Sequence, residues 1–190
     1  MNSRLGLGAA TALWSLVSLV SLAASGHAFA AAMAVDSTSF ANGKTIPLTF
    51  IGAEANCGSG QNLAPQVSWS NVPAGTRSVA VMLFDPDGAK GLGVSHWVAY
   101  NIDPARGQLR QGEAGASVDG VTVGHNTSGA PAYKGLCPPA GDHPHHYVMT
   151  VIATDLPAGA LPAGLGRDEL LGKLKGHGLA GQSVVGTYGH

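Results

Sequence analysis

Three short clusters in the sequence carry side chains that can hold a charged ligand or transfer protons. Asp85–Asp87 supplies two carboxylates, Ser95–Trp97 supplies an imidazole, and His143–Tyr147 supplies three imidazoles and a phenol. Imidazole N–H and phenol O–H groups donate hydrogen bonds to oxygen atoms, and carboxylates accept them. A fold that joined the clusters would bind a small polar ligand or carry out acid–base chemistry.

Each cluster also has a structural explanation. The sequence Asp-Pro-Asp-Gly at 85–88 is typical of a turn, because Asp caps its own backbone and Pro fixes one dihedral angle. A single histidine at a strand end, such as His96, is usually a surface residue or a hydrogen-bonded buried one. Three imidazoles within four positions, at His143, His145 and His146, are harder to explain without a function.

Several other kinds of site do not fit the sequence. Adjacent His145 and His146 point in opposite directions on an extended chain, and no His-x-x-x-His or Cys-x-x-Cys pair completes a zinc site. No Gly-x-Ser-x-Gly motif surrounds Ser95 or Ser183, and no glycine-rich phosphate loop precedes a predicted helix. We therefore predict no metal, no cofactor and no serine hydrolase.

The first thirty residues have the pattern of a secretory signal peptide. Arg4 is the only early charge, residues 5–25 are apolar or small, and Ala28-Phe29-Ala30 has the small-x-small form of a cleavage site. The alternative is an uncleaved membrane anchor, which the glycines of this stretch disfavour. We expect cleavage after Ala30, a mature domain of residues 31–190, and a periplasmic or secreted protein without a stable membrane anchor.

Composition limits the possible partners. The chain of 190 residues has 45% hydrophobic and only 11% charged residues, so it can bury one sizeable core. Ten Lys and Arg oppose eleven Asp and Glu, for a net charge of −1. This balance offers no broad basic surface for a phosphate backbone, and we predict no nucleic-acid partner.

The two cysteines, Cys57 and Cys137, both lie in the predicted mature domain. In an oxidising compartment, two thiols pair if the fold brings them together. The spacing does not prove contact, and two free thiols are the alternative. We expect the disulfide.

The pattern of short apolar runs indicates an all-β domain, because Gly, Pro, Asn and Asp clusters separate them. We predict strands at Thr45–Phe50, Gln66–Val72, Ser78–Phe84, His96–Ile102, Tyr147–Ala153 and Gln182–Tyr188. Two of these, Ser78–Phe84 and Tyr147–Ala153, are apolar at nearly every position, which favours central strands covered on both faces. One helix is predicted at Arg167–Lys175, where leucines follow an acidic first turn.

Taken in order, the motifs resemble those of the phosphatidylethanolamine-binding protein family, in particular its bacterial Raf-kinase-inhibitor-like branch. The resemblance covers about 150 residues, nearly the whole predicted mature chain. It rests on the following segments: Phe40-Ala41-Asn42-Gly43, Ile46-Pro47, Asn62–Trp69, Val72-Pro73, Asp85-Pro86-Asp87, His96–Ile102, Gly135–Gly141, Pro144–Tyr147, His177–Ala180 and Gly186–Tyr188.

This resemblance implies a mainly β fold, an antiparallel β-sandwich with a few short peripheral helices. It also implies a small pocket for phosphate-like anions or phospholipid headgroups, formed by Asp85, His96, His145 and Tyr147, with Pro139 as a wall. A carboxylate in such a pocket is reasonable if Asp85 bonds to His96 or His145, because it would orient the ring and raise its pKa. We therefore expect stronger anion binding at mildly acidic pH.

The sequence departs from the family pattern at the expected pocket rim. Gly88-Ala89 stands where the family typically has Ala-Pro, and Leu136 replaces a frequent Pro. His146 stands where Arg is common, so any ion pair with Asp87 becomes pH-dependent.

Two other functions compete with ligand binding. The family's association with protease and kinase inhibition would require a surface loop that enters an enzyme cleft, with residues 112–126 or 128–135 as candidates. An acid–base enzyme would use Asp85, His96 and His145, although the sequence offers no nucleophile or metal motif. We predict a binding protein rather than an enzyme, and the sequence does not indicate the oligomeric state.

Overall fold

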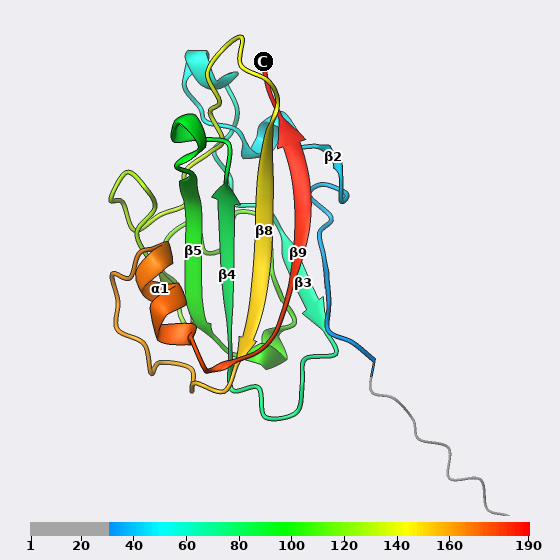
Figure 1. Ribbon diagram of the computed structural model, residues 1–190, viewed down its shortest axis with the longest axis vertical. Coiled ribbons are helices and arrows are strands. Elements are labelled where there is room, and N and C mark those ends of the chain that lie inside the picture. The colour runs from blue at the N-terminus through cyan, green and yellow to red at the C-terminus, as the bar shows by residue number, and fades with distance from the viewer. Residues whose placement is uncertain (1–30) are drawn as a thin grey trace, which may run out of the picture.

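Two β-sheets form the framework of the protein. The computed structural model describes residues 31–190, so the predicted signal peptide and its cleavage at Ala30 lie outside the described residues. The larger sheet has six strands in the order β2-β9-β8-β4-β5-β7, and the smaller has three in the order β1-β3-β6. Figure 1 shows β5, β4, β8 and β9 side by side, with β3 behind them. The mainly β sandwich expected from the sequence is confirmed.

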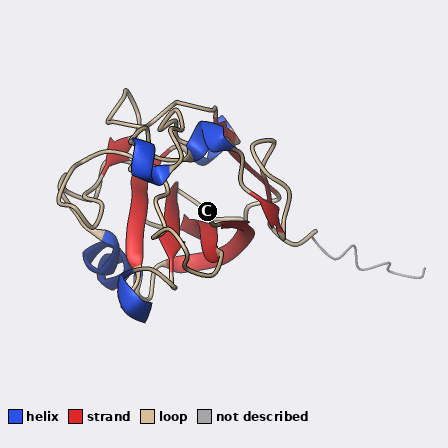
Figure 2. Cartoon of the chain, turned by 90° about the horizontal axis from the view of Figure 1, so that it is seen from above, coloured by secondary structure: helices blue, strands red, loops and turns tan. Residues whose placement is uncertain are grey.

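The elements have the following bounds. The strands are β1 Ala34–Asp36, β2 Lys44–Thr45, β3 Val67–Ser70, β4 Ser78–Asp85, β5 Val94–Ile102, β6 Gln108–Leu109, β7 Thr122–Val123, β8 His145–Thr154 and β9 Gly178–Tyr188. The helix α1 spans Arg167–Leu174, and four short 3₁₀ turns span Leu48–Phe50, Ala55–Cys57, Ala89–Gly91 and Pro104–Arg106. Neighbouring strands pair antiparallel except β2 with β9. Viewed from above, the helical segments lie at the periphery (Figure 2).

Strand β4 is buried on both faces, as predicted. Alternate residues Val79, Val81 and Leu83 enter the main core, which also contains Val67 and Trp69 of the smaller sheet. The residues between them, Ala80 and Met82, enter a second core with Leu170 and Leu174 of α1. Figure 1 shows α1 against the β5 side of the sheet. Both faces of β4 are therefore covered by other layers, which explains its unbroken apolar run.

Strand β8 differs from this prediction. The side chains of Tyr147, Met149, Val151 and Ala153 are fully buried in the main core. Of the positions between and before them, Val148, Thr150 and Ile152 are only half-buried, and His146 is exposed. The expectation of two covered faces holds only in part for β8, because Ile152 packs against the second core while Val148 and Thr150 stay half-buried.

The helix confirms the prediction closely. Its backbone begins after Gly166, whose N–H donates to the Glu169 carboxylate at 2.9 Å, and it ends one residue before the predicted limit. With eight residues, α1 is short, and within residues 31–190 no helix reaches the length and apolar character that crossing a membrane requires.

Two parts of the strand prediction are wrong. The run Thr45–Phe50 contributes only Thr45 to a strand, because Pro47 lacks an N–H and a 3₁₀ turn follows it at Leu48. Strand β9 begins at Gly178, four residues before the predicted start, in a Gly- and Ala-containing stretch of low β propensity. Pairing along the whole length of β8 holds this stretch extended.

Candidate functional site

The candidate site lies at the upper end of the large sheet in Figure 1, where β4 ends and β5 and β8 begin. Because neighbouring strands are antiparallel, the end of one strand lies beside the starts of its neighbours. Asp85 follows Leu83 in the row that faces the main core, and His145 precedes Tyr147 in the corresponding row of β8. Asp85 and His145 are therefore polar residues on the core-facing sides of two adjacent strands, at the end of the sheet.

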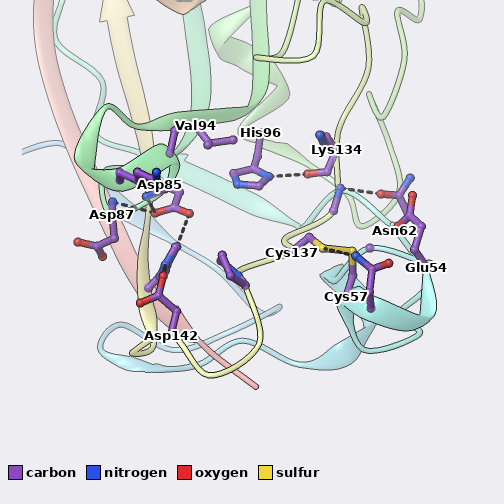
Figure 3. A pocket seen from close by; sticks show the side chains of 18 residues that line it. Glu54, Cys57, Asn62, Asp85, Asp87, Val94, His96, Lys134, Cys137 and Asp142 are labelled. Atoms are coloured by element: carbon purple, nitrogen blue, oxygen red, sulfur yellow. Dashed lines mark hydrogen bonds and ion pairs between the residues drawn. A yellow bond between two sulfur atoms is a disulfide. The ribbon is translucent and has the colours of Figure 1, made fainter.

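Asp85 is a buried carboxylate whose hydrogen bonds come from two directions. Its Oδ1 accepts from the backbone N–H groups of Asp87 and Gly88, each at 2.9 Å. Its Oδ2 accepts from Nδ1 of His145 at 2.8 Å. The turn predicted at 85–88 is therefore present, and the same carboxylate also belongs to the site. Figure 3 shows Asp85 between the Asp87 loop and the cavity.

His145 is held between two carboxylates. Its Nδ1 bonds to Asp85, and its Nε2 lies 3.4 Å from Oδ2 of Asp142. Burial lowers the pKa of the His145 imidazole, but the hydrogen bonds and charges of Asp85 and Asp142 outweigh it, so the pKa lies above its ordinary value. The His145–Asp85 bond is one of the two arrangements expected from the sequence.

His96 stands at an irregularity in the pairing of β5 with β4. Leu83 pairs with Trp97 and Phe84 pairs with Ser95, so His96 is the extra residue of a β-bulge. Its ring is buried, and Nδ1 donates to the Lys134 carbonyl at 2.9 Å, the bond drawn in Figure 3. Burial lowers the pKa of His96, although its bond to Lys134 and the charge of Asp85 oppose the shift.

Tyr147 lies beneath the cavity rather than in its wall. Its ring is fully buried and packs edge-on against His96, with centroids 5.5 Å apart, and roughly parallel to His145 at 6.4 Å. Burial raises the pKa of its hydroxyl, and the charge of Asp85 adds to this effect. Across residues 31–190, neither the Tyr147 hydroxyl nor Nε2 of His96 finds a hydrogen-bond partner. Such unsatisfied buried groups are costly unless a ligand or water meets them.

A cavity of about 680 Å³ opens over these residues. The sequence-predicted residues Asp85, His96, His145 and Pro139 all line it, so the structure brings these four together. The Cys57–Cys137 disulfide is present, as predicted, and both cysteines line the same cavity. It joins the 3₁₀ turn at Ala55–Cys57 to the segment before Pro139, and so fixes two walls against each other.

The mouth of the cavity carries most of its charges, and the sequence analysis missed several of them. Besides Asp85, Asp87 and His145, the charged lining residues are Glu54, Lys90, Lys134 and Asp142. A hydrogen bond from His145 lowers the pKa of the Asp142 carboxyl. Asp142 lies three residues before His145, a spacing that could have indicated it, whereas no local signal placed Glu54, Lys90 or Lys134.

His146, which stands where the family commonly has Arg, forms hydrogen bonds with Asp87 at the cavity rim. Asp87 Oδ2 accepts from the backbone N–H of His146 at 2.7 Å and from its Nδ1 at 2.9 Å. These hydrogen bonds, with the backbone bond as the larger effect, lower the pKa of the Asp87 carboxyl. His146 is thus tied to the rim and is exposed, away from the cavity lining. No group of three or more His, Cys, Asp or Glu within residues 31–190 is arranged to hold a metal ion.

Comparisons with known proteins match this chain to one family. The family model described as phosphatidylethanolamine-binding protein matches residues 36–189. A UPF0098 protein of Aquifex aeolicus is 35% identical over 83% of this chain and 89% of its own. The UPF0098 protein YbcL of Escherichia coli is 37% identical over 65% of this chain and 69% of its own.

Two solved structures share the fold. Escherichia coli YbcL, described as a new member of the mammalian PEBP family, superposes with a TM-score of 0.77 at 29% identity and covers 84% of this chain and 99% of its own. CT736 of Chlamydia trachomatis, described as a phosphatidylethanolamine-binding protein homologue, superposes with a TM-score of 0.71 at 28% identity. The match covers 84% of this chain and 98% of its own. The fold, the ordered motifs and the matched family model together show that this chain belongs to the phosphatidylethanolamine-binding protein family.

Proposed function

We propose that this protein binds a small phosphate-like anion or the phosphoryl part of a phospholipid headgroup in the cavity over Asp85, His96 and His145. The observation that carries the proposal is the pair of buried polar atoms, Tyr147 Oη and His96 Nε2, which have no partner among residues 31–190. Their desolvation has already been incurred on folding, so a ligand that bonds to them gains most of that interaction.

The charges of the lining limit how an anion is recognised. Four carboxylates, those of Glu54, Asp85, Asp87 and Asp142, oppose the ammonium groups of Lys90 and Lys134 and the imidazole of His145. The cavity lining therefore has no net positive charge that would attract an anion. The Tyr147 hydroxyl, a directional donor beneath the cavity, supports anion binding instead, and the carboxylates of the lining suit the ammonium group of a zwitterionic headgroup.

A pair of buried tyrosines provides a sharp test. Tyr147→Phe removes a hydroxyl without a partner, whereas Tyr133→Phe removes one that donates to the Phe50 carbonyl at 2.5 Å. We expect Tyr147→Phe to weaken binding of inorganic phosphate and phosphoethanolamine by about tenfold, with no loss of unliganded stability. Tyr133→Phe should lose about 1–2 kcal/mol of stability and keep its affinity.

Calorimetric titration and thermal unfolding measure both quantities. A ligand that binds the native state alone raises the unfolding temperature with its concentration. If neither phosphate nor phosphoethanolamine binds wild type at millimolar concentration, the proposal is wrong. Equal affinity of Tyr147→Phe and wild type would remove the observation on which it depends.

We propose binding without turnover. His145 has both ring nitrogens directed at carboxylates, an arrangement that holds a proton rather than accepting one. The cysteines of the lining are joined in the disulfide and are not free nucleophiles. Incubation with phosphoethanolamine, followed by phosphorus NMR, should show unchanged ligand; release of inorganic phosphate would establish an enzyme.

We also propose export to the periplasm or beyond. The disulfide supports an oxidising compartment, and one relative, LppC of Mycobacterium tuberculosis, is named as a lipoprotein and is 38% identical over 67% of this chain. Mass spectrometry of the protein from its native host should find Ala31 as the first residue. An intact N-terminus in the cytoplasmic fraction would contradict export.

A further inference from the structure

His96 lines the cavity, and its ring nitrogen Nε2 has no hydrogen-bond partner among residues 31–190. A carbonyl oxygen only accepts hydrogen bonds, so Nδ1 of His96, at 2.9 Å from the Lys134 carbonyl, must carry the ring proton. In a neutral imidazole the other nitrogen, Nε2, is then an acceptor. Burial lowers the pKa of this ring, which favours its neutral form. The position of a backbone carbonyl therefore sets the tautomer.

The surroundings of Nε2 leave this acceptor unused. The titratable groups around the ring are Asp85 from β4, His145 and Tyr147 from β8, and Lys134 from the loop on the other side. The Nδ1 proton of His145 is directed at Asp85, and within the described chain no group donates to Nε2 of His96. The missing donor is left for the ligand to supply.

We propose that His96 makes the pocket selective for tetrahedral oxyanions that keep an acidic proton, namely hydrogen phosphate and phosphate monoesters in their singly charged form. The ligand O–H donates to Nε2 of His96, while the Tyr147 hydroxyl donates to another ligand oxygen. Sulfate and phosphodiesters have no such proton and bring a negative oxygen against a lone pair. This inference rests on the proposed function and narrows its ligand class to free phosphate or a monoester, against the diester of an intact phospholipid headgroup.

The discrimination follows from the cost of a buried polar group without a partner. A site built around a hydrogen bond rejects an analogue that lacks the matching group, because the protein atom stays desolvated and unpaired. His96 is only 4% exposed, so Nε2 stays desolvated beside a bound ion that offers it no proton. We expect phosphate to bind about tenfold or more tightly than sulfate.

The first experiment compares ions that differ by one proton. At about pH 8 both phosphate and sulfate are dianions of similar size, and only phosphate carries an O–H. At about pH 5.5 methyl phosphate and dimethyl phosphate are both monoanions, and only the monoester carries one. Titration calorimetry should show the protonated ion binding about tenfold more tightly in each pair. Equal affinities within the pairs would overturn the selectivity while leaving anion binding intact; no binding of any ion would instead refute the proposed function.

Two variants distinguish the effect of the His96 acceptor on ion preference from the effect of positive charge on ion affinity. His96→Asn keeps an amide N–H near the Lys134 carbonyl and removes Nε2, so the preference for phosphate over sulfate should disappear. Lys134→Met removes a cation of the lining and should weaken both ions by a similar factor, with the preference unchanged. A preference that survives in His96→Asn would assign the selectivity elsewhere.

A spectroscopic measurement tests the tautomer in wild type, whatever the stability of the variants. Nitrogen NMR of histidine-labelled protein without ligand should show His96 protonated at Nδ1 and unprotonated at Nε2. A proton on Nε2 in the free protein would contradict the proposal directly. Nε2 of His96 and the Tyr147 hydroxyl would then both be donors, and the pocket would not prefer phosphate over sulfate.

Discussion

Nδ1 of His145 lies 2.8 Å from Oδ2 of Asp85, with side-chain exposures of only 2% and 4%. At the other end of β8, His177 and Asp155 make a bond of the same length, but their side chains are 46% and 48% exposed. The two pairs share their chemistry and differ in burial. Coulomb attraction and hydrogen bonding are stronger out of water, whereas exposed pairs contribute little. The exposed pair is therefore a natural control for the buried one.

Asp85→Asn should destabilise the protein, more so at acidic than at alkaline pH. The loss is about 2–3 kcal/mol, because an amide cannot accept both backbone N–H bonds and the imidazole bond as the carboxylate does. The pKa of His145 is raised on folding, so its ionic contribution is complete below the unfolded value near 6.5 and is lost as pH rises through the folded pKa.

Urea unfolding of wild type and Asp85→Asn at several pH values measures this difference. The gap between them should narrow as pH rises through the folded pKa of His145. Asp155→Asn should change stability by at most about 0.5 kcal/mol. A gap for Asp85→Asn that is independent of pH would mean that His145 carries no charge in the folded state.

Asp142→Asn should increase affinity for anions. This carboxylate lines the cavity mouth and lies 3.4 Å from Nε2 of His145, where it repels an incoming anion and competes for the same donor. We expect phosphate to bind about threefold to tenfold more tightly, and the gain to shrink at high salt. Calorimetric titration against Asp155→Asn, which removes a remote carboxylate, separates local repulsion from net charge. Weaker binding in Asp142→Asn would indicate that this residue contacts the ligand.

Removing the disulfide should affect both stability and binding. The bond closes a loop of 80 residues, worth about 4–5 kcal/mol on the chain-entropy model, and joins two cavity walls. Cys57→Ser with Cys137→Ser should therefore lower the unfolding temperature and weaken phosphate binding. Dithiothreitol should reproduce both effects in wild type and have no effect on the double variant. Unchanged affinity in the folded double variant would show that the walls hold their positions without the bond.

A methyl group at Gly88 should disturb the site, whereas one at Gly172 should not. A Cβ at Gly88 would lie 2.7 Å from the Val94 side chain and 2.9 Å from Oδ2 of Asp85. We expect Gly88→Ala to lose about 1–3 kcal/mol and most of its phosphate affinity. Gly172 lies in α1 with open space around it, and Gly172→Ala should gain about 0.5–1 kcal/mol. Thermal unfolding and titration of the two variants provide the comparison.

Sequence patterns predicted those features that depend on local order. Continuous apolar runs between turn residues located β4 and most of β8, and the polar clusters were placed at strand ends. The shared pocket of Asp85, His96 and His145 was implied by the family resemblance. The β-bulge at His96 was not predictable, because it arises from a mismatch between two strands and leaves no mark in either one. Likewise, Lys134 reaches the site through its backbone carbonyl, a group that every residue has, so its identity gave no signal.

The walls of the cavity come from stretches near residues 52–62, 85–96 and 134–145. No one of these stretches holds the full set of donors, and the last of them reaches its place only when β8 pairs with β4 and β9. A chain in which β8 has not yet paired with both neighbours therefore lacks the complete cavity. Under the proposed function, the ligand can bind only after this pairing is complete, so an occupied cavity marks a fully folded chain.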